Sequence, residues 1–225
     1  MRIGVISEGH ADRAVITNII TGITGIDRSD IDAIRPIYNI DETDKAVINA
    51  QHFSTWSVVK EECESRELID GFLALEGQDF VVIHIDSAEA DQYGIRRPNR
   101  NSVSYCADLR SLIIQQINIW FNEDLSENIL YAIAIEETDA WILTVYDKSD
   151  STKSAKPKEK LNWILGRLGI NSTSNYDNFL SLSKPLSKTR EIKRSKCLSY
   201  NCSLNAFYKE VCEKVLPKIF AENPS

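Results

Sequence analysis

The feature that most constrains the fold is an uninterrupted apolar run in the middle of the chain, residues 80–85, which ends at Asp86. A strand that is apolar at every position is typical of a parallel sheet whose two faces are both covered. Strand and helix patterns alternate in the rest of the chain, with strands expected at 1–7, 33–40 and 129–135 and strong helices at 12–23 and 103–121. This alternation predicts an α/β fold in which a mostly parallel four-stranded sheet is flanked by helices.

Other segments suggest how the chain is organised around this sheet. Pro36 favours an edge position for the strand at 33–40, and residues 43–75 are expected to be mostly helical. Residues 148–160 are rich in Ser, Lys and Pro, which is typical of a linker or flexible loop. Helical patterns follow at 161–168 and 204–219. We therefore expect one domain at 1–150 and a small, basic, mainly helical C-terminal extension at 151–225.

Charge is distributed unevenly between these two parts. From Lys153 onward the chain has fourteen Lys and Arg residues against six Asp and Glu, whereas the part before it has twelve against twenty-seven. An acidic body with a basic tail suits metal binding in one part and a polyanion in the other. The charge distribution is equally consistent with a simpler interpretation, in which the acidic part and the basic tail are both solvated surfaces.

Several classes of protein are disfavoured by composition. No stretch approaches the roughly 20 apolar residues of a membrane helix, and the N-terminus runs directly into a strand pattern rather than a signal peptide. The five cysteines are scattered and lack paired C-x-x-C spacing. Reduced thiols in a cytoplasmic protein without membrane contact are therefore expected.

Acidic residues follow three of the four predicted strands. Glu8 follows the first strand, Asp86 ends the apolar run, and Glu136, Glu137 and then Asp139 follow the strand at 129–135. Ligands of open parallel sheets bind beyond the carboxyl ends of the strands. Carboxylates gathered there repel one another unless a hard cation such as Mg²⁺ or Mn²⁺ joins them. Any one of these acids alone would be an ordinary structural residue, but together they indicate a metal site.

The order of these motifs resembles the Toprim domain. Glu8-Gly9-His10-Ala11-Asp12 follows the first strand, an apolar strand ends in Asp86, and the segment 137–143 reads Glu-Thr-Asp-Ala-Trp-Ile-Leu. The Toprim domain occurs in topoisomerases, primases and nucleases of the OLD group. The late segment, together with Cys-Ser-Leu-Asn-Ala-Phe at 202–207, is similar to a Toprim-related family of largely uncharacterised bacterial proteins. The resemblance covers about residues 1–150 and implies a Toprim/Rossmann-like sheet.

The resemblance also implies roles for particular residues. Glu8 matches the Toprim acid that serves as general base or metal ligand, and Asp86 matches the first Asp of the D-x-D metal motif. The chain departs from that motif at Ala88, so the missing carboxylate would come from elsewhere. The implied catalytic residues are Glu8, Asp86 and Glu137, and the implied ligands of Mg²⁺ or Mn²⁺ are Glu8, Asp86, Glu89, Asp91, Glu137 and Asp139.

Two groups of basic residues are candidates for binding phosphate or nucleic acid. Arg96, Arg97 and Arg100 lie in a loop expected to overhang the acidic strand ends. The cluster Lys188, Arg190, Lys193 and Arg194 lies in the extension and is followed by Tyr200 and Phe207. Basic groups with aromatic neighbours suit nucleic acid, although a solvated charged segment explains the cluster equally well.

These observations lead to a ranked set of functions. The first is a metal-dependent nuclease or phosphodiesterase acting on DNA or RNA; the resemblance adds an ATPase partner and a role in antiviral defence. The second is a catalytically degenerate Toprim module that binds nucleic acid or a partner ATPase, which Ala88 supports. A receiver-like domain built around Asp86 ranks last, because it lacks an early acidic pair and a late lysine. Trp141 and His84 are expected to be core residues.

Overall fold

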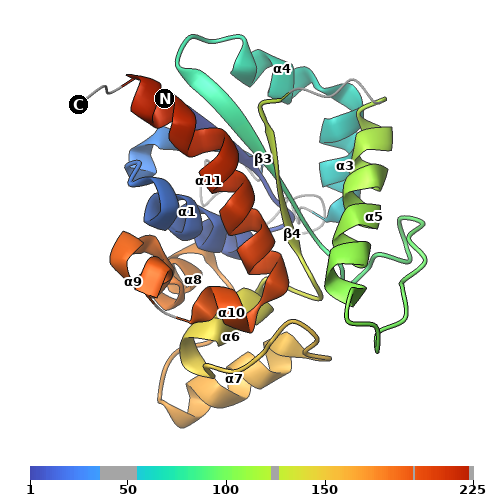
Figure 1. The fold of residues 1–225 in the computed structure, drawn as a ribbon, viewed down its shortest axis with the longest axis vertical. Helices are drawn as coiled ribbons and strands as arrows, with labels where there is room; N and C mark the ends of the chain where they lie inside the picture. Colours follow the sequence, from blue (N-terminus) through green and yellow to red (C-terminus); the bar gives the residue numbers. More distant parts are fainter. Residues whose placement is uncertain (36–54, 123–126, 195, 223–225) are drawn as a thin grey trace, which may run out of the picture.

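The computed structural model describes residues 1–35, 55–122, 127–194 and 196–222 (Figure 1). Its centre is a four-stranded, all-parallel sheet in the order β2-β1-β3-β4. The strands are β1 (Arg2–Ile6), β2 (Ile31–Arg35), β3 (Gln78–Asp86) and β4 (Ile129–Ala134). The predicted α/β fold is confirmed, and the strand expected at 33–40 lies at an edge as β2. Residues 36–40 of that expected strand, and 43–54 of the expected helical segment, lie outside the described residues.

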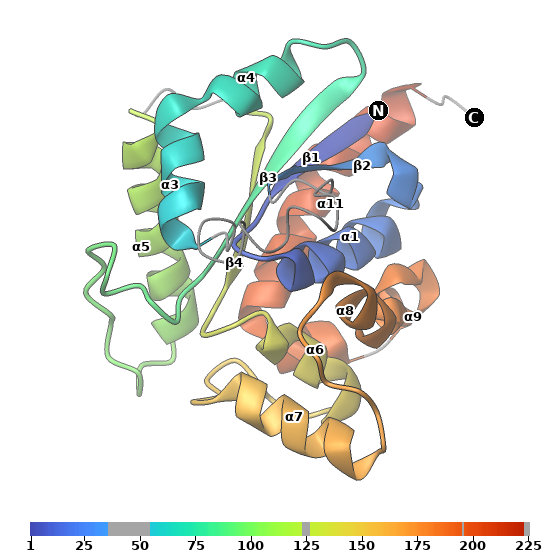
Figure 2. The same cartoon turned by 180° about the vertical axis from the view of Figure 1, so that it is seen from behind.

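Helices cover both faces of the sheet (Figures 1 and 2). One face is covered by α3 (Trp56–Ser65), α4 (Glu67–Leu73) and α5 (Tyr105–Trp120). The other is covered by α1 (His10–Thr24), which leads through the short helix η1 (Arg28–Asp30) into β2, and by α11 (Cys202–Glu222). Of the remaining C-terminal helices, α8 (Tyr176–Leu182), η2 (Lys184–Ser187) and α9 (Thr189–Arg194) pack on α1. Helices α6 (Asp139–Tyr146) and α7 (Pro157–Arg167) lie beyond the strand ends, and α10 (Cys197–Tyr200) contacts α6 and α11. Within the described ranges, none of these helices has the length and apolar character needed to cross a membrane.

Strand β4 is apolar throughout because its successive side chains enter different cores. Along β4, Leu130 and Ala132 pack into the core shared with α1. Their neighbours Tyr131 and Ile133 pack into the core shared with α5. Side chains of a strand alternate between its two faces, so a strand covered on both sides needs apolar residues at every position.

The C-terminal helices belong to the same core as the sheet. Leu161, Phe179 and Phe207 join one buried cluster with Val5 and other residues of β1 and α1. Trp141 is fully buried, stacks on Phe207 with a centroid separation of 5.9 Å, and donates its indole N–H to Ser203 (2.8 Å). The prediction that Trp141 is a core residue is confirmed. The change of charge near residue 150 is not accompanied by a break in the hydrophobic core.

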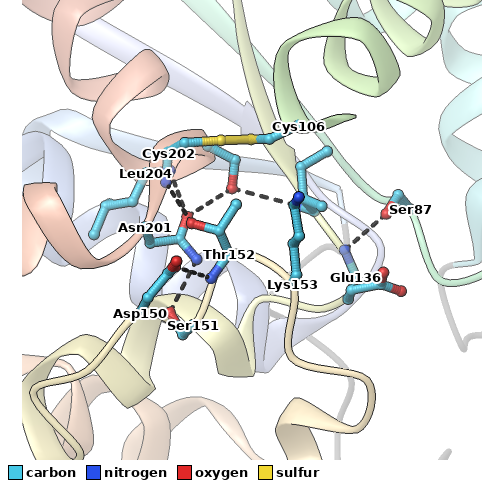
Figure 3. Close-up of a disulfide and its surroundings, with 12 residues drawn as sticks. Ser87, Cys106, Glu136, Asp150, Ser151, Thr152, Lys153, Asn201, Cys202 and Leu204 are labelled. Atoms are coloured by element: carbon cyan, nitrogen blue, oxygen red, sulfur yellow. Dashed lines mark hydrogen bonds between the residues drawn. A yellow bond between two sulfur atoms is a disulfide. The ribbon is translucent and has the colours of Figure 1, made fainter. Parts of the chain in front are cut away.

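The segment interpreted as a linker is a packed loop. The hydroxyl of Ser151 is buried and donates to the carbonyl of Ala140 (2.6 Å), and its backbone N–H donates to the carbonyl of Tyr200 (2.8 Å). The Asn201 amide donates to the same hydroxyl (3.1 Å; Figure 3). The linker interpretation is therefore wrong at Ser151, because composition does not reveal that one serine ties α6 to the start of α11, and the last residues of the segment, from Pro157 on, belong to α7.

Two cysteines form a disulfide, contrary to the expectation of reduced thiols. Cys106 in the first turn of α5 is bonded to Cys202 at the start of α11, with 6.7 Å between their Cα atoms (Figure 3). Cys63, Cys197 and Cys212 are not part of it. The pairing joins helices from opposite faces of the sheet across 96 residues of sequence. Such pairings depend on the fold, so cysteine spacing alone does not predict them.

The edge of the sheet at β4 is covered by side chains of α11. The N–H of Tyr131 donates to Glu210 (3.2 Å), and Lys214 donates to the carbonyl of Ile129 (2.8 Å). Just beyond the strand, the N–H of Ile135 donates to Ser203 (3.3 Å). Side-chain partners of this kind protect an edge strand from pairing with another chain.

Candidate carboxylate site at the switch point of the sheet

The strand order defines where a ligand is expected to bind. After β1 the chain crosses by α1 to β2 on one side, whereas after β3 it crosses by α5 to β4 on the other. The helices α1 and α5 lie on opposite faces, so a crevice opens between the carboxyl ends of β1 and β3. Glu8 lies two residues after β1, and Asp86 is the last residue of β3. The two acids therefore flank this switch point.

Glu8 and Asp86 are held next to each other by backbone hydrogen bonds. One carboxylate oxygen of Glu8 accepts the N–H of Asp86 (2.7 Å). One oxygen of Asp86 accepts the N–H of Ala88 (2.9 Å). Ala88, where the D-x-D motif would have its second acid, thus contributes a backbone donor while its side chain is exposed. Both carboxylates are partly buried and fixed in position before any ligand binds.

Three further acids line the same cavity. Asp12 lies in the first turn of α1, Glu137 follows β4, and Asp139 begins α6. Together with Glu8 and Asp86 they line a cavity of about 890 Å³, which we call the switch-point cavity. The structure thus brings together four of the six implied metal ligands and adds Asp12.

Burial and mutual repulsion make these carboxyls harder to ionise. Burial, with smaller contributions from Asp12 and Glu89, raises the pKa of Glu8 to about 8, although backbone N–H groups act in the opposite direction. Burial and the neighbouring Glu8 raise the pKa of Asp86 well above its usual value. Burial and Glu137 raise the pKa of Asp139 to about 7. A cation in the cavity would relieve this repulsion.

The donor set fits a hard divalent cation. Its side chains are carboxylates, and Mg²⁺ is usually held by one or two carboxylates together with waters and substrate phosphate rather than by a full protein cage. In the described ranges, no three His, Cys, Asp or Glu side chains are grouped closely enough to enclose a metal ion by themselves. The fit is therefore to an open site centred on the pair Glu8 and Asp86.

Glu89 and Asp91 lie outside this arrangement. Both are exposed in the loop after β3, and neither lines the switch-point cavity. Glu89 is close enough to contribute to the raised pKa of Glu8. Their implied role as metal ligands stays a prediction that the geometry favours less than it does for Glu137 and Asp139.

Glu136 and Glu137 are adjacent in sequence, but their side chains lie in different places and have different neighbours. Glu136 has a left-handed backbone (φ 67°), and its N–H donates to the buried hydroxyl of Ser87 (2.7 Å; Figure 3). Its side chain pairs with Arg97 (3.2 Å) and Arg100 (3.4 Å). Glu137 instead lines the cavity. The reversal at Glu136 is what turns the second acid toward the site.

The loop arginines make contacts within the protein. Besides Glu136, Arg97 donates to the carbonyls of Ser87 and Ala88 and to the Tyr105 hydroxyl. Arg100 donates to the carbonyl of Lys153 (2.9 Å). Arg96 is exposed, and none of the three arginines lines the switch-point cavity. Their predicted contact with substrate phosphate would require these internal contacts to rearrange.

The wall opposite the acids comes from the C-terminal extension and was missed by sequence reasoning. It consists of Lys158 from α7 and polar residues of the 171–181 segment, among them Asn171, Asn175 and Tyr176. The N–H of Lys158 donates to Glu137 (3.2 Å). The side chain of Asn178 donates to the carbonyl of Asn171 (2.9 Å), which stabilises this turn. No sequence motif identifies the wall, because it depends on how the extension packs.

Contacts with α1 fix that wall in place. The side-chain amide of Asn18 donates to the carbonyl of Leu180 (2.8 Å) and to the hydroxyl of Ser183 (2.7 Å). The guanidinium of Arg13 lies over the Tyr176 ring, 4.8 Å from its centroid. Since α1 also carries Asp12, the polar wall and the acids are held by the same helix.

The basic cluster of the extension lies elsewhere. Lys188 follows η2 and pairs with Glu191 (2.8 Å), Arg190 lines a second cavity, and Lys193 is exposed on α9. The side chain of Arg194 lies outside the described residues. None of the four lines the switch-point cavity. His84, predicted as a core histidine, is fully buried beside the hydroxyl of Thr138 (2.9 Å), as expected.

The fold and the cavity define a class of protein: a parallel α/β protein with a carboxylate-lined ligand cavity at its switch point. Comparison of the chain with protein-family models, with curated proteins and with solved structures gave no match. The case for a function therefore depends on the site itself.

Proposed function

We propose that the protein is a Mg²⁺- or Mn²⁺-dependent phosphodiesterase that acts on DNA or RNA. The observation that carries the proposal is the pair Glu8 and Asp86 at the switch point, facing one cavity with Asp12, Glu137 and Asp139. An acid cluster that is partly buried is unfavourable unless a cation binds it, and hard cations bound through oxygen are typical of phosphoryl-transfer sites. The Toprim-like order of the motifs is consistent with this assignment.

The residues that line the switch-point cavity would have separate roles in the reaction. A divalent ion, when bound, would supply Lewis-acid polarisation of a phosphoryl oxygen. Asp86 and Glu137 would hold that ion at the carboxyl ends of the strands. Glu8, ionised once the cation offsets the repulsion between the acids, would accept the proton that the attacking water loses. Lys158, the exposed cation on the wall, contacts the phosphate group.

Cleavage assays with conservative variants test this function. Mixed single- and double-stranded DNA and RNA are incubated with Mg²⁺ or Mn²⁺ and with wild type, Glu8→Gln or Asp86→Asn. The matched control is Glu76→Gln, an exposed acid in the turn before β3 that does not line the cavity. We expect metal-dependent cleavage by wild type and the control and its loss in both site variants. Equal activity in all four proteins would refute the proposal.

One observation favours a second candidate, a non-catalytic module that binds nucleic acid or a partner ATPase. Ala88 removes the second D-x-D carboxylate, and no enclosing group of three ligands is preassembled in the described ranges. In that case folded wild type would bind neither Mg²⁺ nor Mn²⁺ by calorimetry and would cleave none of the substrates. Metal binding without cleavage would instead point to a substrate class absent from the assay.

A further inference from the structure

A second cavity of about 810 Å³ lies among the C-terminal helices. Its lining comes from α6, η2, α9 and α10, and we call it the α9 cavity. It shares no lining residue with the switch-point cavity. The two cavities are lined by neighbouring parts of the chain, since Ser181 of α8 lines the first and Pro185 of η2 the second. A ligand of the α9 cavity would therefore bind outside the carboxylate site.

Three cations that have no partner among the described residues surround this cavity. Lys148, Arg190 and Lys196 line it with exposed side chains. Across the described part of the chain, these side chains make no hydrogen bond or ion pair. The acid in the lining, Glu191, is already paired with Lys188 (2.8 Å). Three like charges around one hollow repel each other, and an anion removes that repulsion.

The floor of the cavity is apolar and firmly placed. Leu186 is nearly fully buried, and Val145 and Tyr200 are partly buried beside it. The carbonyl of Leu186 approaches α1 so closely that a Cβ on Gly22 would lie 1.9 Å from it. Glycine at position 22 thus allows η2 to pack directly on α1. The floor is consequently part of the core rather than a loose surface.

We propose that the α9 cavity binds a small phosphate-bearing molecule with an aromatic body, such as a nucleotide. Arg190 offers the planar fork that pairs with two phosphate oxygens, and the two lysines add point charges. Tyr200 and the apolar floor would contact the ring. The volume lies in the usual range for small-molecule sites, roughly 300–1,000 Å³. The site does not depend on the proposed cleavage activity.

Binding of defined probes tests the site. AMP, GMP, CMP, UMP and inorganic phosphate are titrated by calorimetry into the full chain, with a chelator present so that no metal bridges phosphate to the acids. The variants are Arg190→Ala and Lys148→Ala, and Asp86→Asn reports on the other cavity. The matched control is Lys193→Ala, which removes an exposed cation of the same helix that does not line the cavity.

We expect at least one nucleotide to bind more tightly than inorganic phosphate. Arg190→Ala should weaken it about tenfold or more, because a charge-assisted hydrogen bond is lost. Lys193→Ala and Asp86→Asn should leave the affinity within about twofold. Absence of binding by every probe, or equal weakening by Arg190→Ala and Lys193→Ala, would overturn the proposal. A short 5′-phosphorylated oligonucleotide bound through Arg190 far more tightly than any mononucleotide would overturn the assignment to a small ligand.

Discussion

The switch-point cavity and the α9 cavity differ in charge, and they also differ in how the chain assembles them. The acids of the first come from strand ends and from the first turns of the helices that follow them, and they meet because the strands are parallel. The cations of the second come mainly from one short stretch around α9, joined by Lys148. Long-range topology thus creates the acidic site, whereas local helix packing creates the basic one. The two sites should accordingly respond to different substitutions.

The largest expected effect separates the two cavities by function. Glu8→Gln should reduce metal-dependent cleavage by on the order of 10²–10⁴-fold, the usual contribution of a general base, and should leave nucleotide binding unchanged. Arg190→Ala should weaken nucleotide binding and leave metal-dependent cleavage unchanged. Cleavage rates and calorimetric affinities measured on the same preparations check this. Loss of both activities in either variant would mean that the two cavities form one site.

A stability measurement tests whether the extension that carries the α9 cavity is a separate unit. Phe207 on α11 is fully buried against Trp141, so Phe207→Ala should lower the free energy of unfolding by about 3–5 kcal/mol. Phe220→Ala removes the same ring where it is 68% exposed on the same helix and should cost less than about 0.5 kcal/mol. Urea unfolding followed by circular dichroism should show one transition in all variants. Two separate transitions would contradict the shared core.

Of the two cavities, only the switch-point cavity is expected to make the free energy of unfolding depend on pH and on metal concentration. The pKa values of Glu8 (about 8) and Asp139 (about 7) are raised above their ordinary values of 4.5 and 3.8. The folded protein therefore binds these protons more tightly than the unfolded chain. Their contribution to stability is complete below about pH 4 and is lost as the pH rises through 7 and 8.

The expected result is a melting temperature that falls between about pH 6 and pH 9 in the absence of metal. Millimolar Mg²⁺ or Mn²⁺ should raise it by several degrees near pH 8.5 and by less near pH 6, because protons compete with the metal. Glu8→Gln, which has no titrating group at this position, should reduce both the slope and the metal effect. Scanning fluorimetry across this range suffices. A metal effect that is the same at all pH values would argue against binding by these carboxylates.

The sequence predicted those parts of the fold and site that follow from hydrophobic periodicity. The run at 80–85 indicated a parallel sheet, and parallel strands place their ends together, so Glu8, Asp86 and Glu137 could be grouped without coordinates. The different orientations of Glu136 and Glu137 could not be predicted from the sequence, because they depend on the left-handed backbone of Glu136.

Features that depend on packing between distant segments were also missed. The hydrogen bonds of Ser151 lie inside a stretch whose composition suggests a linker, and the Cys106–Cys202 disulfide joins two helices that are 96 residues apart in sequence. The short helices α8, α9 and α10 carry too few turns for a clear period, so the polar wall had no signal in the sequence, and the only signal of the α9 cavity was the basic cluster that contains Arg190.

The smallest expected effect concerns Lys158, the cation that faces the acids. Its charge lowers the pKa of Asp139 and so acts against the raising effect of Glu137. Lys158→Ala removes an exposed charge, so effects of about two- to fivefold are expected. The variant should bind Mg²⁺ slightly more tightly, because one repulsive charge is gone, and its KM for a nucleic-acid substrate should rise, because a phosphate contact is lost.

These opposite signs distinguish an electrostatic role from a structural one. A merely destabilised wall would weaken the binding of metal and substrate together, whereas a charge effect strengthens one and weakens the other. Lys158→Gln keeps most of the side-chain volume and should reproduce the alanine result, and Lys156→Ala, an exposed neighbour that does not line the cavity, should change neither quantity. Magnesium affinity by calorimetry and KM from initial rates decide the question. If Lys158→Gln binds metal more weakly than wild type, the acids and the polar wall cooperate in metal binding. The proposal that the acids bind metal while the wall binds substrate would then be incorrect.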